Sequence, residues 1–249
     1  MNLAQRIKRE KGFILAFALL MLITLSASAV EDEEDVDPYE GFNRAMFSFN
    51  EQLDIYLAKP VAQFYDFVMP SFLNQGVTNF FNNLDDVETF ANSLLQGKFH
   101  NSVVTLNRVI WNTTVGLAGF IDVATHFGLR NDEEDFGQTL AVWGYENSAY
   151  VVWPFFGPST IRDSFGRAAD TYTEPLNYVE SFSTVERLAI QGLKYTDLRA
   201  DLLSVEGLIT GNDPYIFIRN AYLQNREFLI RDGAVVDEFA ADDLYLEDF

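Results

Sequence analysis

Apolar residues recur every three or four positions along most of the chain, as they do on one face of a helix. The first such stretch runs from Phe42 to Tyr56, and Asp37 and Pro38 before it predict an N-cap and a first helical residue. We expect Pro60 to interrupt this helix, because a proline in a helix interior removes a hydrogen bond and clashes with the preceding turn.

Similar apolar stripes predict further helices, at 61–70, 77–97, 184–209 and 213–232. Within 184–209 we expect Leu188, Leu198 and Leu202 to be buried. Two segments rich in β-formers, Thr139–Trp143 and Tyr150–Phe156, predict one short hairpin between 139 and 156. The chain is therefore expected to be all-α apart from this hairpin.

The stretch from Phe99 to Phe127 is rich in apolar residues, but polar residues interrupt it before it reaches the length of a membrane-spanning helix. Gly116 and Gly119 lie within it, three residues apart. Two interpretations are open: a helix half-buried in the plane of a membrane, or a helix that ends near these glycines and is followed by a new one.

The first residues have the features of a cleavable secretory signal. Four of the 17 basic residues precede position 12, an apolar run follows, and Ala27-Ser28-Ala29 supplies the small residues that a signal peptidase needs. The apolar run is shorter than the roughly 20 residues that span a bilayer. The expected organisation is a signal at 1–29, an acidic linker at 30–37, a helical domain at 38–231 and an acidic tail at 232–249.

Composition narrows the possible functions. The net charge of −20 argues against nucleic acid as a partner, because such a surface repels phosphate backbones. The chain has no cysteine, which excludes disulfides and thiol catalysis and leaves no cysteine to carry a lipid. Aromatic residues make up 15% of the chain, so they form either an ordinary core or a surface that faces lipid.

The sequence shows no signature of a catalytic or metal site. His100 and His126 have no second ligand at metal-binding spacing, and no nucleophile elbow, P-loop or dinucleotide fingerprint occurs. We therefore expect no metal, no cofactor and no enzymatic activity. The adjacent acids Asp85-Asp86 and Glu133-Glu134 point apart on a helix and are expected to be solvated.

Several short blocks together resemble the MlaA (VacJ) family, outer-membrane components of the system that maintains lipid asymmetry. The blocks occur in order over residues 37–233: Asp37-Pro38-Tyr39-Glu40-Gly41-Phe42-Asn43-Arg44, Asn82-Asn83-Leu84, Leu95-Gln96-Gly97, Arg108 with Asn112-Thr113, Gly116, Gly119 and Asp122, Phe136-Gly137-Gln138-Thr139-Leu140, Gly157-Pro158-Ser159 with Arg162-Asp163, and Asp213-Pro214-Tyr215.

The resemblance implies a single ring-shaped helical domain with an amphipathic central channel, lying in the inner leaflet of the outer membrane beside a trimeric porin. Misplaced phospholipid would leave the outer leaflet through the channel and pass to a periplasmic lipid carrier, without chemistry on the lipid. The family-motif residues expected at functional positions are Phe42, Asn43, Arg44, Asn112, Asp122, Arg162 and Asp163.

The chain departs from the family pattern in three places. Many relatives carry an acylated cysteine after the signal, whereas this chain has none. Relatives tend to have a glycine-rich run where this chain reads Gly144 to Tyr150, and they often have glycine at the position of Ala118. Gly116, Gly119 and Gly144 are candidates for a channel wall or hinge, and Glu146 for a charge near the polar mouth.

The alternative function is that of a soluble periplasmic lipid-binding protein or enzyme. The two classes differ in where the aromatic residues go. A soluble protein buries them in a core, whereas a protein embedded in lipid exposes them outward.

Overall fold

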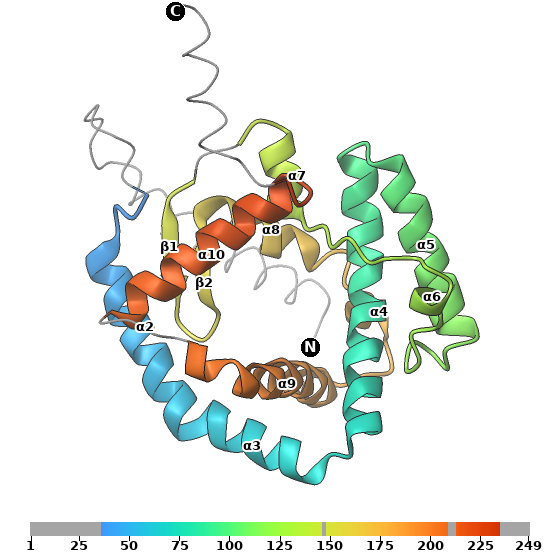
Figure 1. Ribbon diagram of the computed structural model, residues 1–249, viewed down its shortest axis with the longest axis horizontal. Helices are drawn as coiled ribbons and strands as arrows, with labels where there is room; N and C mark the ends of the chain where they lie inside the picture. The colour runs from blue at the N-terminus through green and yellow to red at the C-terminus, as the bar shows by residue number, and fades with distance from the viewer. Residues whose placement is uncertain (1–35, 146–147, 209–212, 235–249) are drawn as a thin grey trace, which may run out of the picture. The chain divides into compact units, whose positions relative to one another are not determined.

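A helical arc begins the described part of the chain, which comprises residues 36–145, 148–208 and 213–234 of the computed structural model (Figure 1). The arc consists of α2 (Glu40–Leu53), the π-helix η1 (Asp54–Ala58) and α3 (Lys59–Val68). Pro60 therefore does not interrupt the helix, contrary to expectation. The π-helix widens the turn in front of Pro60, with the amide of Lys59 donating to the carbonyl of Asp54, and so accommodates the ring.

The start of the arc also differs from the sequence prediction. Tyr39, and not Asp37, occupies the N-cap position of α2. Asp37 is buried and receives hydrogen bonds from more distant parts of the chain. The carboxylate is thus used to join elements together, a role that the local pattern around Pro38 does not reveal.

Two long helices follow the arc and lie side by side (Figure 1). They are α4 (Ser71–Leu95) and α5 (Phe99–Thr114), and a turn after α5 leads to the short α6 (Val123–His126). Of the two interpretations for 99–127, the structure has the helix end followed by a new helix. Pro70 separates α3 from α4, as its effect on the preceding residue predicts.

The hairpin exists, but its first predicted strand is helical. α7 (Phe136–Val142) includes Thr139, because Asp135 caps the helix and accepts a hydrogen bond from the amide of Gln138 at 2.8 Å. The antiparallel strands are β1 (Tyr150–Trp153) and β2 (Gly157–Thr160). Thr160 then caps α8 (Ile161–Asp170).

The C-terminal part holds two more long helices, α9 (Thr184–Asp201) and α10 (Pro214–Ile230). Ser183 and Glu186 form a capping box on α9, and Asp213 caps α10. Short 3₁₀ turns span Pro175–Tyr178, Leu202–Ser204 and Glu206–Leu208. Leu188, Leu198 and Leu202 are exposed, so the prediction that they are buried is wrong.

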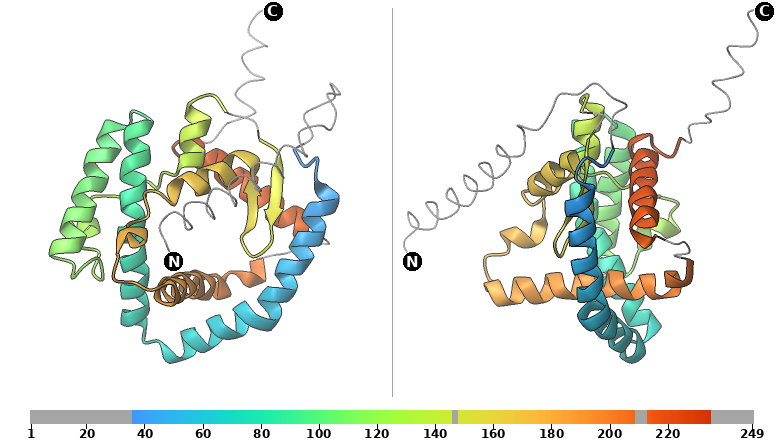
Figure 2. Two further views of the ribbon diagram at one scale, coloured as in Figure 1. Left: turned by 180° about the vertical axis from the view of Figure 1, so that it is seen from behind. Right: turned by 90° about the vertical axis from the view of Figure 1, so that its left-hand side faces the viewer.

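The elements of the unit Val36–Phe249 contact one another in a closed circuit. α2 packs on β1, α3 on α9, α9 on α4, and α4 on α7; α7 contacts α8 and α10, and α10 returns to β2. Figure 2 shows that α9 runs across α3 and α4 instead of along them. The expected helical class with one short hairpin is confirmed, and this circuit agrees with a ring. The central channel stays a prediction.

Two small apolar clusters hold the circuit together. Ala62 and Tyr65 of α3 pack against Ala200 of α9. Tyr150 of β1 packs with Val152 and with Tyr215 of α10. Neither cluster is a large core, so the packing of this protein relies on polar contacts to an unusual degree.

Candidate functional site

Polar side chains occupy the interior and apolar ones occupy much of the surface. Arg108 and Asp86 are 3% and 0% exposed, whereas Phe64 and Phe67 of α3 are 67% and 87% exposed. Soluble monomers usually bury large apolar side chains, and contiguous exposed ones mark contact with lipid or protein. The distribution therefore points to an apolar environment around part of this protein.

Exposed apolar residues form one face of α5. Phe99, Val103, Leu106 and Ile110 are all exposed, and their spacing of four, three and four residues places them on one side of the helix. A further exposed set lies along the arc: Phe42, Phe49, Tyr56, Phe64, Phe67 and Val68. We call these two sets the exposed apolar faces.

Asn43 ties the arc to the hairpin. Its Nδ2 donates to the carbonyl of Tyr150 at 3.1 Å and to the carboxylate of Asp37 at 2.7 Å. Its Oδ1 accepts from the amide of Val152 at 2.8 Å. The hydroxyl of Tyr215 on α10 also donates to Asp37. A family-motif residue thus supplies the edge of β1 with hydrogen bonds that a third strand would otherwise make.

The neighbours of Asn43 in the sequence face outward. Phe42 belongs to the exposed apolar face of the arc. Arg44 forms ion pairs with Asp213 at 2.8 Å and with Glu40 at 2.6 Å, and its guanidinium lies 4.4 Å from the ring centroid of Tyr215. The hydrogen bond from Arg44 lowers the pKa of the Asp213 carboxyl, which caps α10.

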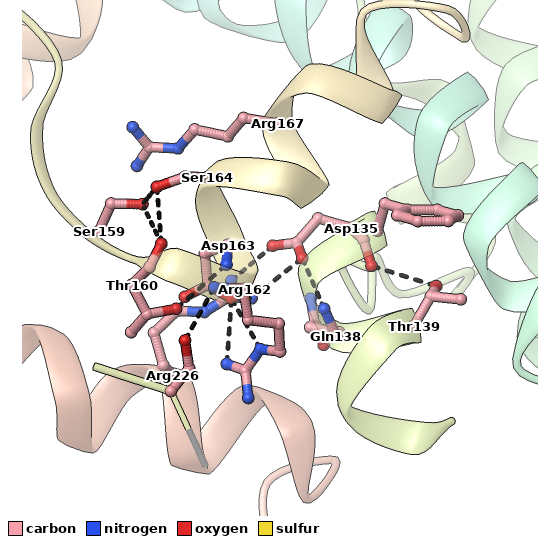
Figure 3. Close-up of polar contacts among 12 residues, drawn as sticks. Asp135, Gln138, Thr139, Ser159, Thr160, Arg162, Asp163, Ser164, Arg167 and Arg226 are labelled. Carbon is pink, nitrogen blue, oxygen red and sulfur yellow. Dashed lines mark hydrogen bonds and ion pairs between the residues drawn. The ribbon is translucent and has the colours of Figure 1, made fainter. Parts of the chain in front are cut away.

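Arg162 and Asp163 belong to a buried network between α7, α8 and α10 (Figure 3). Asp163 accepts from Arg162 at 3.0 Å, from Arg226 at 3.0 Å and from the hydroxyl of Tyr222 at 2.8 Å. Arg226 also pairs with Asp135 at 2.5 Å. Burial alone would raise the pKa of Asp135, but the hydrogen bond from Arg226 holds it below its usual value.

Arg226 is a residue that the sequence interpretation missed. A single arginine in an amphipathic helix carries no motif. Its position four residues after Tyr222 places the two side chains on one face of α10, and that spacing was the available signal.

Asn112 and Asp122 belong to a third network, which closes the turn between α5 and α6. Asn112 donates to Asp122 at 3.1 Å and accepts from the amide of Ala124 at 2.9 Å. Arg108 pairs with the fully buried Asp86 at 3.1 Å. The expectation that Asp86 is solvated is therefore wrong. Burial raises the pKa of Asp86 to about 6 despite Arg108.

Glu134 is likewise buried instead of solvated, and it pairs with Lys98 at 2.6 Å. Asp85-Asp86 lies on α4, whereas Glu133-Glu134 lies in the non-helical segment before α7, and in each pair one acid is buried. His100 and His126 are exposed.

Gly116 and Gly119 shape the turn after α5. A Cβ on Gly116 would lie 2.1 Å from the carbonyl oxygen of Ile121, and Gly119 has φ +94° with Asn83 2.7 Å from the position of its missing Cβ. Leu117 and Ala118 between them also have positive φ values, 55° and 59°. Gly116 is thus required by close backbone approach, and Gly119 by its positive φ and the nearby Asn83 side chain. The position of Ala118 is one that favours glycine.

Gly144 differs from this pair. It follows α7 at the surface with φ +104°, and no heavy atom lies within 4 Å of an added Cβ. Glycine is therefore favoured at position 144 by the positive φ, and not by a lack of space for a side chain. Glu146, the other candidate of this loop, lies outside the described residues.

Two cavities lie beside α4. The first, of about 220 Å³, is lined mainly by charged side chains from α4, α9 and the segment 133–135. The second, of about 500 Å³, lies between the start of α4 and residues 120–126. In the described ranges, no three His, Cys, Asp or Glu side chains are placed to hold a metal ion. No described helix combines the length and apolar character needed to cross a bilayer.

The sequence is similar to characterised bacterial proteins over most of its length. The protein of Escherichia coli (strain K12) named intermembrane phospholipid transport system lipoprotein MlaA is 34% identical over 224 residues, which cover 88% of each chain. The Haemophilus influenzae protein of the same name is 34% identical over 242 residues, covering 92% of this chain and 96% of that one.

The fold is also similar to a solved structure, from work on the structural basis for maintenance of bacterial outer membrane lipid asymmetry. That structure is 35% identical in sequence with a TM-score of 0.70, and the match covers 78% of this chain and 98% of the other. The pattern of the family described as MlaA lipoprotein matches residues 35–229. On this agreement of sequence and fold, the chain belongs to the MlaA lipoprotein family.

Proposed function

We propose that this protein moves phospholipid at the outer membrane without changing it chemically. Misplaced phospholipid leaves the outer leaflet through an amphipathic channel within the helical circuit and passes to a periplasmic lipid carrier of the same pathway. The names of the E. coli and H. influenzae relatives, which place them in an intermembrane phospholipid transport system, support this proposal.

The placement of apolar and polar side chains carries the proposal. Phe64 and Phe67 on the arc and Phe99 on α5 are more than half exposed, while Arg108 and Arg226 are buried. Such a body suits the inner leaflet of the outer membrane, because its apolar faces can contact acyl chains. Its polar interior supplies the hydrogen-bonding groups that a lipid headgroup needs.

We also propose that the exposed apolar faces and a trimeric porin, and not a lipid on cysteine, hold the protein at the membrane. The 249 residues contain no cysteine, and cleavage after Ala29 would give an unacylated N-terminus near Val30. The signal itself lies outside the described residues. N-terminal sequencing and intact mass test this attachment, and a retained segment 1–29 or an acyl mass contradicts it.

Two measurements on cells test the proposed function. The full chain is expressed in a bacterium that lacks its own family member, and the cell envelope is separated into periplasm and outer membrane. We expect the protein in the outer-membrane fraction and a fall in outer-leaflet phospholipid. Protein confined to the soluble periplasm would favour the soluble lipid-binding protein or enzyme, and unchanged outer-leaflet phospholipid would exclude the transport function.

A further inference from the structure

The cavity of about 220 Å³ beside α4 is rich in carboxyl groups. Its lining residues include five acids and a single basic residue, Lys194. The acids come from α4 and from the loop before α7: Asp85, Glu88, Glu133, Glu134 and Asp135. Groups of one charge gathered in a cavity attract a ligand of the opposite charge.

Three of these acids already have cations. Asp85 pairs with Lys194 at 2.5 Å, Glu134 with Lys98 at 2.6 Å, and Asp135 with Arg226 at 2.5 Å. No basic side chain in the described part of the chain forms an ion pair with Glu88 or Glu133. These two carboxyl groups are therefore open to a further cation, with Glu88 also hydrogen-bonded to Asp170.

Gln138 provides an observation that is independent of the acids. It lines the same cavity, is 2% exposed, and donates through Nε2 to the carbonyl of Glu133 at 3.1 Å. Its Oε1 has no hydrogen-bond partner. A buried amide oxygen without a donor is costly, so a donor supplied by a ligand would satisfy it.

We propose that this cavity binds a primary ammonium group, with Glu88, Glu133 and the Oε1 of Gln138 as acceptors. An ammonium carries three N–H donors, which matches these three acceptors. Leu229, which also lines the cavity, supplies an apolar wall for the adjoining methylene groups. A metal ion fits less well, because no three ligating side chains converge among the described residues.

The protonation of Glu88 supports a cation at this place. Burial, together with the charges of Asp170, Asp85 and Asp135, raises the pKa of Glu88 to about 9. Its side chain hydrogen-bonds to Asp170, and burial raises the pKa of Asp170 to about 6. Other titratable groups lie in the same cavity, namely Glu133, Glu134 and Lys194, and Glu174 interacts with Lys194 from outside it. An arriving ammonium replaces the proton as the compensating charge, and the proton leaves to solvent.

Two sources carry a primary ammonium: the ethanolamine headgroup of a phospholipid and a free amine. The first source rests on the proposed function, and the second does not. Isothermal titration of the full-length protein in detergent distinguishes them, with dihexanoylphosphatidylethanolamine, dihexanoylphosphatidylcholine and ethanolamine as separate probes. The choline headgroup has no N–H donor and is bulkier, so it tests the hydrogen bonds directly.

We expect the ethanolamine lipid to bind at least about tenfold more tightly than the choline lipid. Glu133→Gln is expected to weaken binding of the ethanolamine lipid about tenfold. Glu51→Gln, at an exposed position of α2, is expected to leave that affinity unchanged. Ethanolamine that binds as tightly as the lipid identifies free amines as the source. Because Glu88 loses a proton on binding, the observed enthalpy should change with the ionisation enthalpy of the buffer, and Glu88→Gln should remove that change.

Equal affinity of the wild-type protein for the two lipids would overturn the proposal. So would unchanged ethanolamine binding in both Glu88→Gln and Glu133→Gln, with folding confirmed by circular dichroism. Transfer of phosphatidylglycerol, which has no ammonium, is measured in parallel. If the wild-type protein does not transfer phosphatidylglycerol, that result would count against the proposed transport function, whatever the titrations show.

Discussion

Arg226 of α10 donates a hydrogen bond to Asp163 of α8 at 3.0 Å, and both side chains are buried. The contact joins segments 63 residues apart in the sequence. Since Arg226 pairs with both Asp163 of α8 and Asp135 at the start of α7, this one guanidinium joins three helices.

Arg226→Ala should lower the free energy of unfolding by about 3–5 kcal/mol, because Asp135 loses its cation and Asp163 keeps only Arg162. Arg231→Ala, which removes an exposed pair with Glu227 on the same helix, should cost no more than about 1 kcal/mol. Urea denaturation in detergent measures both variants. If the two variants lost a similar free energy of unfolding, burial of the Arg226 ion pairs would not explain the effect.

Gly119→Ala should be more destabilising than Gly97→Ala. Both glycines have positive φ, +94° and +76°, so alanine costs about 1–2 kcal/mol at either position. Only at Gly119 does the added Cβ also meet a neighbour, Asn83 at 2.7 Å, which adds about 1–3 kcal/mol. A Gly119→Ala protein of normal stability that fails to export lipid would instead place Gly119 at the channel wall.

Gly144→Ala should impair lipid export while the helical circular dichroism spectrum stays unchanged. Alanine disfavours the φ of +104°, so the surface loop after α7 is driven to another conformation without any clash. Gly192→Ala on α9, where an added Cβ also meets nothing, is the control and should export normally. Normal outer-leaflet composition in Gly144→Ala would refute a hinge at this residue.

The free energy of unfolding should fall as the pH rises from 5 to 9. Burial raises the pKa of Asp86 and Asp170 to about 6 and that of Glu88 to about 9. A carboxyl whose pKa is raised by folding stabilises the folded state when protonated, and this contribution is lost as the pH passes through the raised value.

Glu88→Gln should therefore flatten the pH dependence and stabilise the protein at pH 8, by at least about 1.4 kcal/mol. Below pH 4 the direction reverses, because the pKa of Asp135 is lowered in the folded state and its contribution is lost on protonation. Thermal unfolding at pH 5, 7 and 9 measures the effect. A slope equal to that of the wild-type protein would show that Glu88 keeps its ordinary pKa.

Phe67→Asp should shift the protein from the outer membrane to the soluble fraction without unfolding it. Phe67 is 87% exposed, and a carboxylate in an apolar membrane region costs about 3 kcal/mol. Gln63→Asp adds the same charge at an exposed polar position of α3 and should remain at the membrane. Equal retention of both variants would mean that α3 does not contact lipid.

The helices could be predicted because their apolar periodicity is local, but the side that faces inward could not. Periodicity shows that a helix has two faces. Which face is buried depends on the surroundings, and Leu188 is exposed while Asp86 is fully buried. A rule derived from soluble proteins therefore fails at these positions.

The networks were predicted only in part, for a related reason. Asn43, Asn112 and Asp163 belong to blocks that resemble the family, so they were singled out. Arg226 and Glu88 were not, because their partners lie far away in the sequence and only the folded chain brings them together. Likewise, the β-propensity of Thr139–Trp143 was overridden by the helix cap at Asp135.

The π-helix at Asp54–Ala58 adds one residue to a turn, and an extra residue advances the helical phase by about 100°. The sequence of α3 is thereby offset by one residue from the helical phase of α2. Phe64 and Phe67 of α3 are exposed in this arrangement. Because the wide turn already holds one residue more than an α-helical turn, it can lose one residue and become α-helical while the side chains of α3 keep their direction. A one-residue deletion at 54–58 should therefore be tolerated better than one within α2 or α3, where no such turn absorbs the change of phase.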